Sequence, residues 1–139
     1  MTVKLHHIGI GVKSLEDTVS YFKRALSLEP FEYVMLSGSK AALFKVGDII
    51  LEFIEPDDHP VNQAGRSIMN IVSTTGGGIQ HLAFELADFD KAVQNLKDND
   101  LNLNEEGVRC GKHGRFAWLE QVRNQGYMIE LCEKDYKIG

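Results

Sequence analysis

The sequence predicts an α+β fold made of two tandem βαβββ modules. The first sign is a pair of short apolar segments with strand-like composition, one containing His7 and the other His81. Each segment runs into residues that start helices, and apolar residues then recur at the same offsets from the two histidines. Such matching offsets are typical of a duplicated supersecondary unit. The residues at matching offsets are Val19 and Val93, followed by Phe22 and Leu96.

The first module is assigned to residues 1–56. Its first strand is expected at 3–13, and Ser14 with Asp17 three residues later forms a helix-start signal of the capping-box kind. A helix of about 14 residues follows and ends near Pro30. Its apolar face is predicted to carry Leu15, Val19, Phe22 and Leu26. The remaining strands are expected at about 31–37, 40–46 and 49–55.

The second module is assigned to residues 78–139 and repeats this order. A strand at 79–87 leads to Asp88, which is predicted to cap a helix. The three following strands are expected near 101–108, 114–120 and 127–132. A connector at 57–77 contains one predicted helix, which a run of glycines terminates. The whole chain of 139 residues is expected to form a single domain.

Alternation along the strands places the two histidines beside small residues. In the first strand, His7 shares a face with Gly9 and Gly11, while apolar side chains occupy the other face. In the first strand of the second module, His81 shares a face with Ala83. We therefore expect both histidines to face away from the helices, with space in front of them for a ligand.

Two glutamates close the modules in strands that are otherwise apolar. Glu52 lies in Ile-Ile-Leu-Glu-Phe-Ile, and Glu130 lies in Tyr-Met-Ile-Glu-Leu. An ionised carboxylate is rarely buried without a partner, because its desolvation is costly. Two imidazoles and two carboxylates suit a divalent cation that keeps open positions for substrate. The sequence thus predicts that His7, Glu52, His81 and Glu130 bind one divalent metal ion, for which Ni, Co, Zn, Mn and Fe are all compatible.

Bulk composition excludes several classes of function. The formal charge of −5 and the pI near 5.5 argue against a nucleic-acid-binding protein, which needs a basic face. No apolar run reaches the length of a membrane span, and the N-terminus lacks the apolar region of a signal peptide. The two cysteines, Cys110 and Cys132, form no CxxC pair and are expected to be reduced. These observations predict a cytoplasmic protein without nucleic-acid or membrane partners.

These segments resemble the vicinal oxygen chelate superfamily, which includes glyoxalase I, bleomycin resistance proteins, methylmalonyl-CoA epimerase, extradiol dioxygenases and fosfomycin resistance enzymes. The resemblance covers nearly the whole chain and depends on residues 6–12, 50–56, 78–85 and 129–131. It is greatest to methylmalonyl-CoA epimerase. The features shared with that group are the Gly47-Asp48 turn, the Glu55-Pro56 strand end and the turn Lys112-His113-Gly114-Arg115.

The resemblance implies a curved, mixed half-barrel sheet around a central metal site, in a homodimer. It also implies that His7, Glu52, His81 and Glu130 are the metal ligands and that the substrate is a thioester of glutathione or CoA. Glu130 or Glu52 would remove the proton next to a carbonyl or thioester while the metal stabilises the enolate. The predicted activity is therefore that of a metal-dependent isomerase or lyase. Further candidates for substrate contacts are Lys112, His113 and Arg115.

One segment departs from the epimerase pattern, and other functions stay open. Epimerases of this kind carry an acidic residue between the second and third strands as one of two bases, but residues 35–40 contain no carboxylate. A ring-cleaving iron dioxygenase would need only His7, His81 and Glu130 as ligands. Glu52 argues against that function, because it would occupy a position that the catechol or oxygen needs. A non-catalytic protein that binds a small molecule, such as an antibiotic, is a further alternative.

Overall fold

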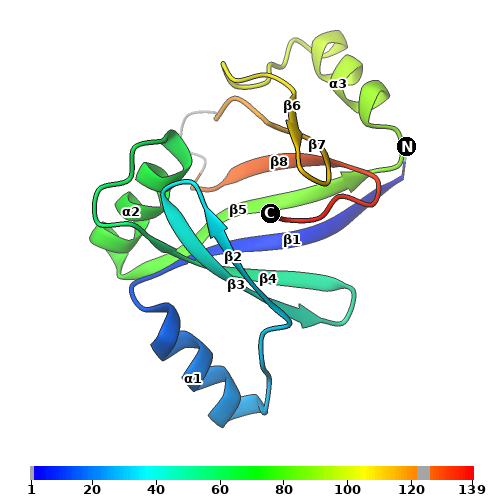
Figure 1. The fold of residues 1–139 in the computed structure, drawn as a ribbon. Helices are drawn as coiled ribbons and strands as arrows, with labels where there is room; N and C mark the ends of the chain where they lie inside the picture. The colour runs from blue at the N-terminus through cyan, green and yellow to red at the C-terminus, as the bar shows by residue number, and fades with distance from the viewer. Residues whose placement is uncertain (1, 122–125) are drawn as a thin grey trace. The chain divides into compact units, whose positions relative to one another are not determined.

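The computed structural model describes residues 2–121 and 126–139 (Figure 1). The first set of elements is β1 (Val3–Val12), α1 (Leu15–Leu26), β2 (Glu32–Leu36), β3 (Ser39–Val46) and β4 (Ile49–Pro56). A connecting helix, α2 (Gln63–Thr75), follows. The second set is β5 (Gly77–Leu86), α3 (Phe89–Asp98), β6 (Arg109–Gly111), β7 (Gly114–Trp118) and β8 (Met128–Glu133). This order confirms the predicted α+β class, with two βαβββ sets joined by a helical connector.

The chain divides into two compact units, and the division passes through β1 and β5. The N-terminal unit comprises His7–Gln80, and the C-terminal unit comprises Met1–His6 together with His81–Gly139. The start of the chain belongs to the C-terminal unit because it lies beside the end of β5, where the Ala87 amide donates to the Thr2 carbonyl at 3.2 Å. The module boundaries expected from the sequence stay predictions.

The strands of the N-terminal unit run in the order β2-β3-β4-β1. β1 and β4 are parallel, whereas β3 is antiparallel to both β2 and β4. α1 packs against one face of this sheet, where the Phe22 ring centroid lies 5.5 Å from that of Phe44 and 5.0 Å from that of Phe53. Aromatic rings at this spacing attract one another beyond the effect of burial alone. This core holds β3 and β4 against the helix.

The start of α1 agrees with the sequence prediction, but its apolar face is shorter than expected. Ser14 caps the helix, because its Oγ accepts the Asp17 amide at 3.1 Å. Glu55 Oε1 accepts a hydrogen bond from the amide of Leu15, the first residue of the helix, at 2.9 Å. The helix ends at Leu26, and Ser27 adopts the left-handed conformation with φ 52°. Leu26 is 66% exposed, so the prediction that it packs with the apolar face was wrong.

α2 covers part of the opposite face of this sheet. Ile68 and Val72 of the helix form a buried cluster with Ala41 and Ile54. Gly11 permits this close approach, because a Cβ there would lie 3.4 Å from the side chains of both Ile68 and Val72. A glycine expected from the sequence to leave space for a ligand therefore makes room for a helix.

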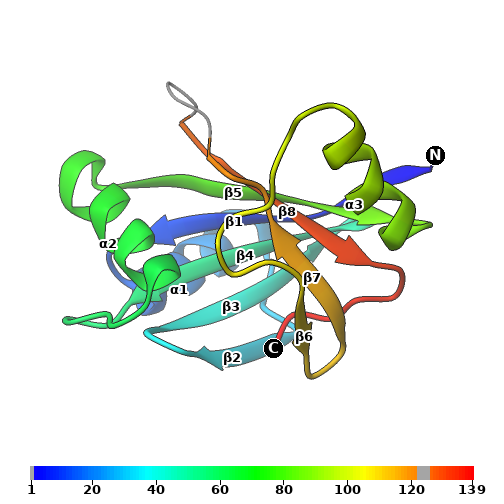
Figure 2. The ribbon, with the colours of Figure 1, turned by 90° about the horizontal axis from the view of Figure 1, so that it is seen from above.

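In the C-terminal unit the strands run in the order β5-β8-β7-β6, and α3 packs against β8 (Figure 2). Asp88 caps α3 as predicted, and its side chain accepts the Lys91 amide at 3.0 Å. The buried core consists of Leu86, Phe89, Ala92, Leu96, Ala117 and Leu131. Within the described ranges, none of the helices combines the length and apolar character that a membrane span requires.

The strand expected at 101–108 is the one element that the structure places elsewhere. The strand is β6, a short one at Arg109–Gly111, and residue Leu103 forms only an isolated bridge with Leu119. A turn interrupts the expected strand, because Gly107 has a positive φ of 65° and its amide donates to the Asn104 carbonyl at 3.0 Å. The apolar residues before the turn are too few to form a strand of their own.

Candidate metal centre

In the N-terminal unit, a buried histidine and a buried glutamate lie on neighbouring parallel strands. The pairing of β1 with β4 aligns Gly9 with Glu52. Because alternate residues share a face, His7 projects from the same face as Glu52. His7 Nε2 lies 3.8 Å from Glu52 Oε1, and the two residues are 1% and 3% exposed. The prediction that both residues bind one metal ion together with His81 and Glu130 stays a prediction.

The C-terminal unit contains a second pair built in the same way. The pairing of β5 with β8 aligns Ala83 with Glu130, and His81 lies two residues before Ala83 on the same face. His81 Nε2 lies 3.5 Å from Glu130 Oε2, and both residues are buried. In both units, the residue aligned with the glutamate on the strand of the histidine is small, Gly9 for Glu52 and Ala83 for Glu130. The duplication seen in the sequence therefore extends to the register of the two pairs.

The distances within each pair are compatible with two ligands of one metal ion. Strong N–H···O contacts lie at about 2.7–3.2 Å, and the separations of 3.5 and 3.8 Å are longer. Two ligands bound about 2.1 Å from one cation lie about 3.0 Å apart at a right angle and about 3.4 Å apart at the tetrahedral angle. Small rotations of the side chains would bring each pair to these values. The donor set fits a divalent cation.

Trp118 is a residue of this region that the sequence did not single out. Its indole lies edge-on to the His81 imidazole, with ring centroids 4.9 Å apart and ring planes at 84°. Trp118 on β7 is aligned with Glu130 on β8, so it shares a face with that glutamate. The sequence alone does not show which face of the sheet Trp118 occupies. The pairing of β7 with β8 shows that it is the face of Glu130.

The structure places Arg115 in an ion-pair cluster. Its guanidinium lies 2.8 Å from Asp90 Oδ1 and 3.1 Å from Glu133 Oε1, and it covers the Phe89 ring at 4.9 Å. Hydrogen bonding to the Arg115 side chain lowers the pKa of Asp90. Hydrogen bonds from the Arg115 amide and then from its side chain lower the pKa of Glu133, while bonding to Asp90 and Glu133 raises the pKa of Arg115. The cluster ties α3 to β7 and β8.

The other two candidates for substrate contacts lie in the turn between β6 and β7. Lys112 and His113 are both exposed. The His113 carbonyl accepts the Lys137 amide at 3.3 Å, which connects the turn to the end of the chain. A role in substrate binding for Lys112, His113 and Arg115 stays a prediction.

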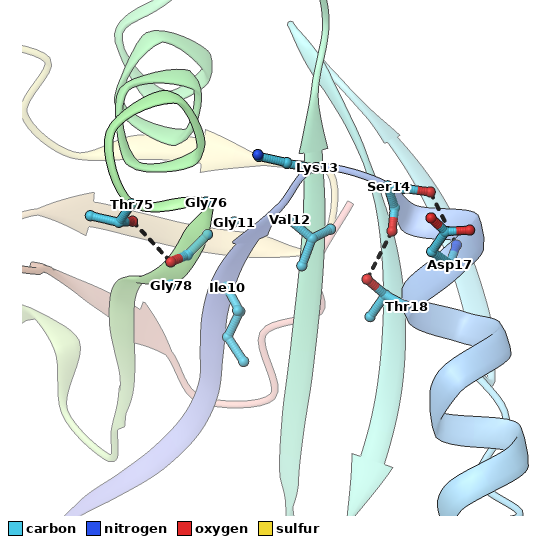
Figure 3. A pocket seen from close by; sticks show the side chains of 11 residues that line it. Ile10, Gly11, Val12, Lys13, Ser14, Asp17, Thr18, Thr75, Gly76 and Gly78 are labelled. Atoms are coloured by element: carbon cyan, nitrogen blue, oxygen red, sulfur yellow. Dashed lines mark hydrogen bonds between the residues drawn. The ribbon is translucent and has the colours of Figure 1, made fainter.

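A cavity of about 430 Å³ lies elsewhere in the N-terminal unit, between the start of α1 and the turn from α2 to β5 (Figure 3). Two hydroxyl groups of its lining bond to nearby backbone carbonyls: Thr18 Oγ1 donates to the Ser14 carbonyl at 2.8 Å, and Thr75 Oγ1 donates to the Gly77 carbonyl at 2.9 Å. Neither His7 nor Glu52 lines it. This cavity is therefore distinct from the candidate metal-binding pair of this unit.

Comparison with known proteins decides the family. Residues 6–118 match the Glyoxalase/Bleomycin resistance protein/Dioxygenase superfamily. The protein belongs to this superfamily. The match runs from within β1 to the end of β7 and includes three of the four predicted ligands, His7, Glu52 and His81.

Several relatives cover almost the whole chain. The uncharacterized protein YqjC of Bacillus subtilis (strain 168) is 30% identical over 135 residues, which are 94% of this chain and 91% of that protein. The mitochondrial methylmalonyl-CoA epimerase of Homo sapiens is 25% identical over 131 residues, covering 92% of this chain and 72% of that enzyme. The crystal structure of methylmalonyl-CoA epimerase from Mycobacterium tuberculosis matches with a TM-score of 0.77 and 25% identity, covering 93% of this chain and 86% of that one.

Proposed function

We propose that this protein is a divalent-metal-dependent isomerase that removes and returns a proton next to the carbonyl of an acyl-CoA thioester. The observation that carries the proposal is the pair of buried His–Glu arrangements, one in each unit and in the same strand register. Relatives that are methylmalonyl-CoA epimerases over nearly the whole chain support an acyl-CoA as the substrate. A glutathione thioester is the other substrate class predicted from the sequence.

The proposed ligands of the cation are His7, Glu52, His81 and Glu130, all of which are buried. Two carboxylates balance the charge of one divalent ion. The attraction to the ion then offsets the desolvation free energy of burying the two glutamates. Such a cation would supply Lewis-acid stabilisation of the negative charge that develops on the substrate oxygen. Mixed nitrogen and oxygen ligation admits Ni, Co, Zn, Mn or Fe.

The protein side chains would handle the proton. Glu52 or Glu130 accepts the proton of the carbon next to the thioester, because a carboxylate oxygen is a general base. The enolate then regains a proton at the same carbon, and reprotonation on the opposite face inverts the configuration. Gly9 and Ala83, aligned with the two glutamates, leave space for the acyl group beside them. Trp118 packs against His81 and holds the imidazole ring in one orientation.

The test combines metal analysis with turnover of both thiol-linked substrate classes. We expect the purified protein to hold about one divalent ion per chain and to exchange the α-proton of methylmalonyl-CoA with deuterium from the solvent. The hemithioacetal of methylglyoxal and glutathione is the comparison substrate, and its conversion would assign the protein to the lyase branch instead. A protein that binds the metal fully but turns over neither compound would contradict the proposal.

The alternative of an iron dioxygenase is disfavoured by the position of Glu52. A two-histidine, one-carboxylate site leaves three positions open for catechol and oxygen. Here a second carboxylate projects from the same face as His7 and lies 3.8 Å from its imidazole. Oxygen consumption with a catechol after loading with ferrous iron would support the dioxygenase.

The homodimer and the cytoplasmic location stay predictions from the sequence.

A further inference from the structure

A row of directly aligned residues crosses the sheet of the N-terminal unit and connects two glutamates. Glu32 on β2 is aligned with Leu43 on β3, and Leu43 is aligned with Glu52 on β4. Residues that pair directly across strands project from the same face of a sheet. Glu32 and Glu52 therefore lie on the same face, one on each side of Leu43.

The two glutamates lie two strands apart, with Leu43 between them on the same face. Neighbouring strands lie about 4.8 Å apart, so the Cα atoms of Glu32 and Glu52 are separated by about 9.6 Å. Glu32 is exposed, and within residues 2–121 and 126–139 no hydrogen bond or ion pair occupies its carboxylate. By contrast, the carboxylates of Glu29 and Glu55 are bound to Lys23 and Lys40.

Inversion at a carbon needs proton transfer on both of its faces. A single carboxylate removes and returns a proton on one face only, so it permits exchange with solvent but no change of configuration. A second acid on the other side of the carbon must deliver the new proton. Residues 35–40, where the sequence resemblance leads us to expect this group, contain no carboxylate. The alignment of β2 with β3 instead places the carboxylate of Glu32, which comes earlier in the chain, on the same face as Glu52.

We propose that Glu32 is the second proton-transfer residue of the isomerase, acting from the side of the substrate carbon opposite to Glu52. This inference rests on the proposed function. In one direction, the C–H bond breaks as Glu52 takes the proton, and its electron pair forms the enolate. Protonated Glu32 then gives its proton to the other face, which forms the new C–H bond and leaves Glu32 ionised. The opposite turnover restores both groups, so no other reactant is consumed.

The decisive variant is Glu32→Gln, followed in deuterium oxide with each isomer of methylmalonyl-CoA separately. We expect the rate of inversion to fall by about 100-fold or more, the usual effect of losing a general acid or base. Exchange of the α-proton without inversion should persist for the isomer whose proton faces Glu52. Metal content, substrate affinity and melting temperature should stay at the wild-type values, because Glu32 is exposed and is not a proposed ligand.

Two further variants sharpen the result. Glu32→Asp keeps the carboxylate on a shorter side chain and should recover part of the inversion rate. Glu16→Gln removes the same charge from an exposed position on α1, and it should invert both isomers at the wild-type rate. Inversion by Glu32→Gln at the wild-type rate would overturn the assignment of Glu32 alone. A wild-type protein that neither exchanges nor inverts would overturn the proposed function and this inference with it.

Discussion

The single tryptophan of the chain, Trp118, lies edge-on to His81 with 4.9 Å between the ring centroids. An indole in this position reports directly on any metal bound to the imidazole. We expect Co²⁺ or Ni²⁺ to quench the intrinsic tryptophan fluorescence in a saturable way, with an end point near one ion per chain. Mg²⁺, which prefers oxygen ligands, should leave the emission almost unchanged at the same concentration.

Substitution of Trp118 should weaken metal binding without abolishing it. Groups that orient a metal-ligating histidine affect the affinity for the metal by about 10-fold or more when they are removed. Trp118→Leu keeps an apolar residue but loses the flat edge that packs against His81, so we expect affinity for Co²⁺, measured by calorimetry, to fall by several-fold. Trp118→Phe retains an aromatic ring, so its affinity for Co²⁺ should fall less. Equal affinity in all three proteins would show that Trp118 does not position the ligand.

The buried glutamates should have opposite effects on stability with and without metal. In the metal-free protein, Glu52→Gln or Glu130→Gln removes a charge from a buried site, so the melting temperature should stay level or rise. A metal that binds only the folded protein stabilises it by about 2.7 kcal/mol at a concentration of 100 times Kd. Both variants should lose most of that metal-dependent gain, as measured by thermal unfolding with and without EDTA.

A matched control for this experiment is Glu105→Gln, because Glu105 is an exposed carboxylate of the C-terminal unit. Its metal-dependent gain in melting temperature should equal that of the wild type. A full metal-dependent gain in Glu52→Gln would remove Glu52 from the ligand set, and that outcome would bring the three-ligand site of a dioxygenase back into consideration.

The Arg115 cluster should give a stability difference that depends on pH. The pKa values of Asp90 and Glu133 are lowered in the folded protein by Arg115, so their contribution is present above the pKa of the unfolded carboxyls, near 4. It is lost as the pH falls through the lowered values. We therefore expect Arg115→Met to melt below the wild type at neutral pH and to approach it in strong acid. A difference that is constant across this pH range would contradict the ion-pair explanation.

The sequence singled out the four candidate ligands because each depends on local signals. Glu52 and Glu130 stand out as charged residues in apolar strands, and alternation assigns His7 and His81 to defined faces. Glu32 and Trp118 could not be found in this way. Their importance depends on the alignment of Glu32 with Leu43 and of Trp118 with Glu130, and strand register between distant segments is set by packing rather than by local pattern.

The elements that differed from prediction also have physical reasons. Leu26 continues the helical apolar spacing, but the helix ends there, and the side chain remains in solvent. The strand expected at 101–108 was inferred from short apolar alternation, yet the left-handed Gly107 requires a turn within it. In both cases, a chain reversal determined by backbone conformation prevailed over a side-chain pattern.

Two adjacent glycines offer a direct test of how closely β1 and β5 approach within the N-terminal unit. Gly76 and Gly77 both have positive φ, at 84° and 134°. A Cβ at Gly76 would meet no atom within 4 Å, whereas one at Gly77 would lie 2.7 Å from the Gly11 carbonyl oxygen. Gly76→Ala should therefore cost about 1 kcal/mol, the conformational penalty alone. Gly77→Ala adds a backbone clash, so chemical denaturation should show a loss at least about twice as large. Equal losses for the two variants would mean that β1 and β5 can separate here without cost.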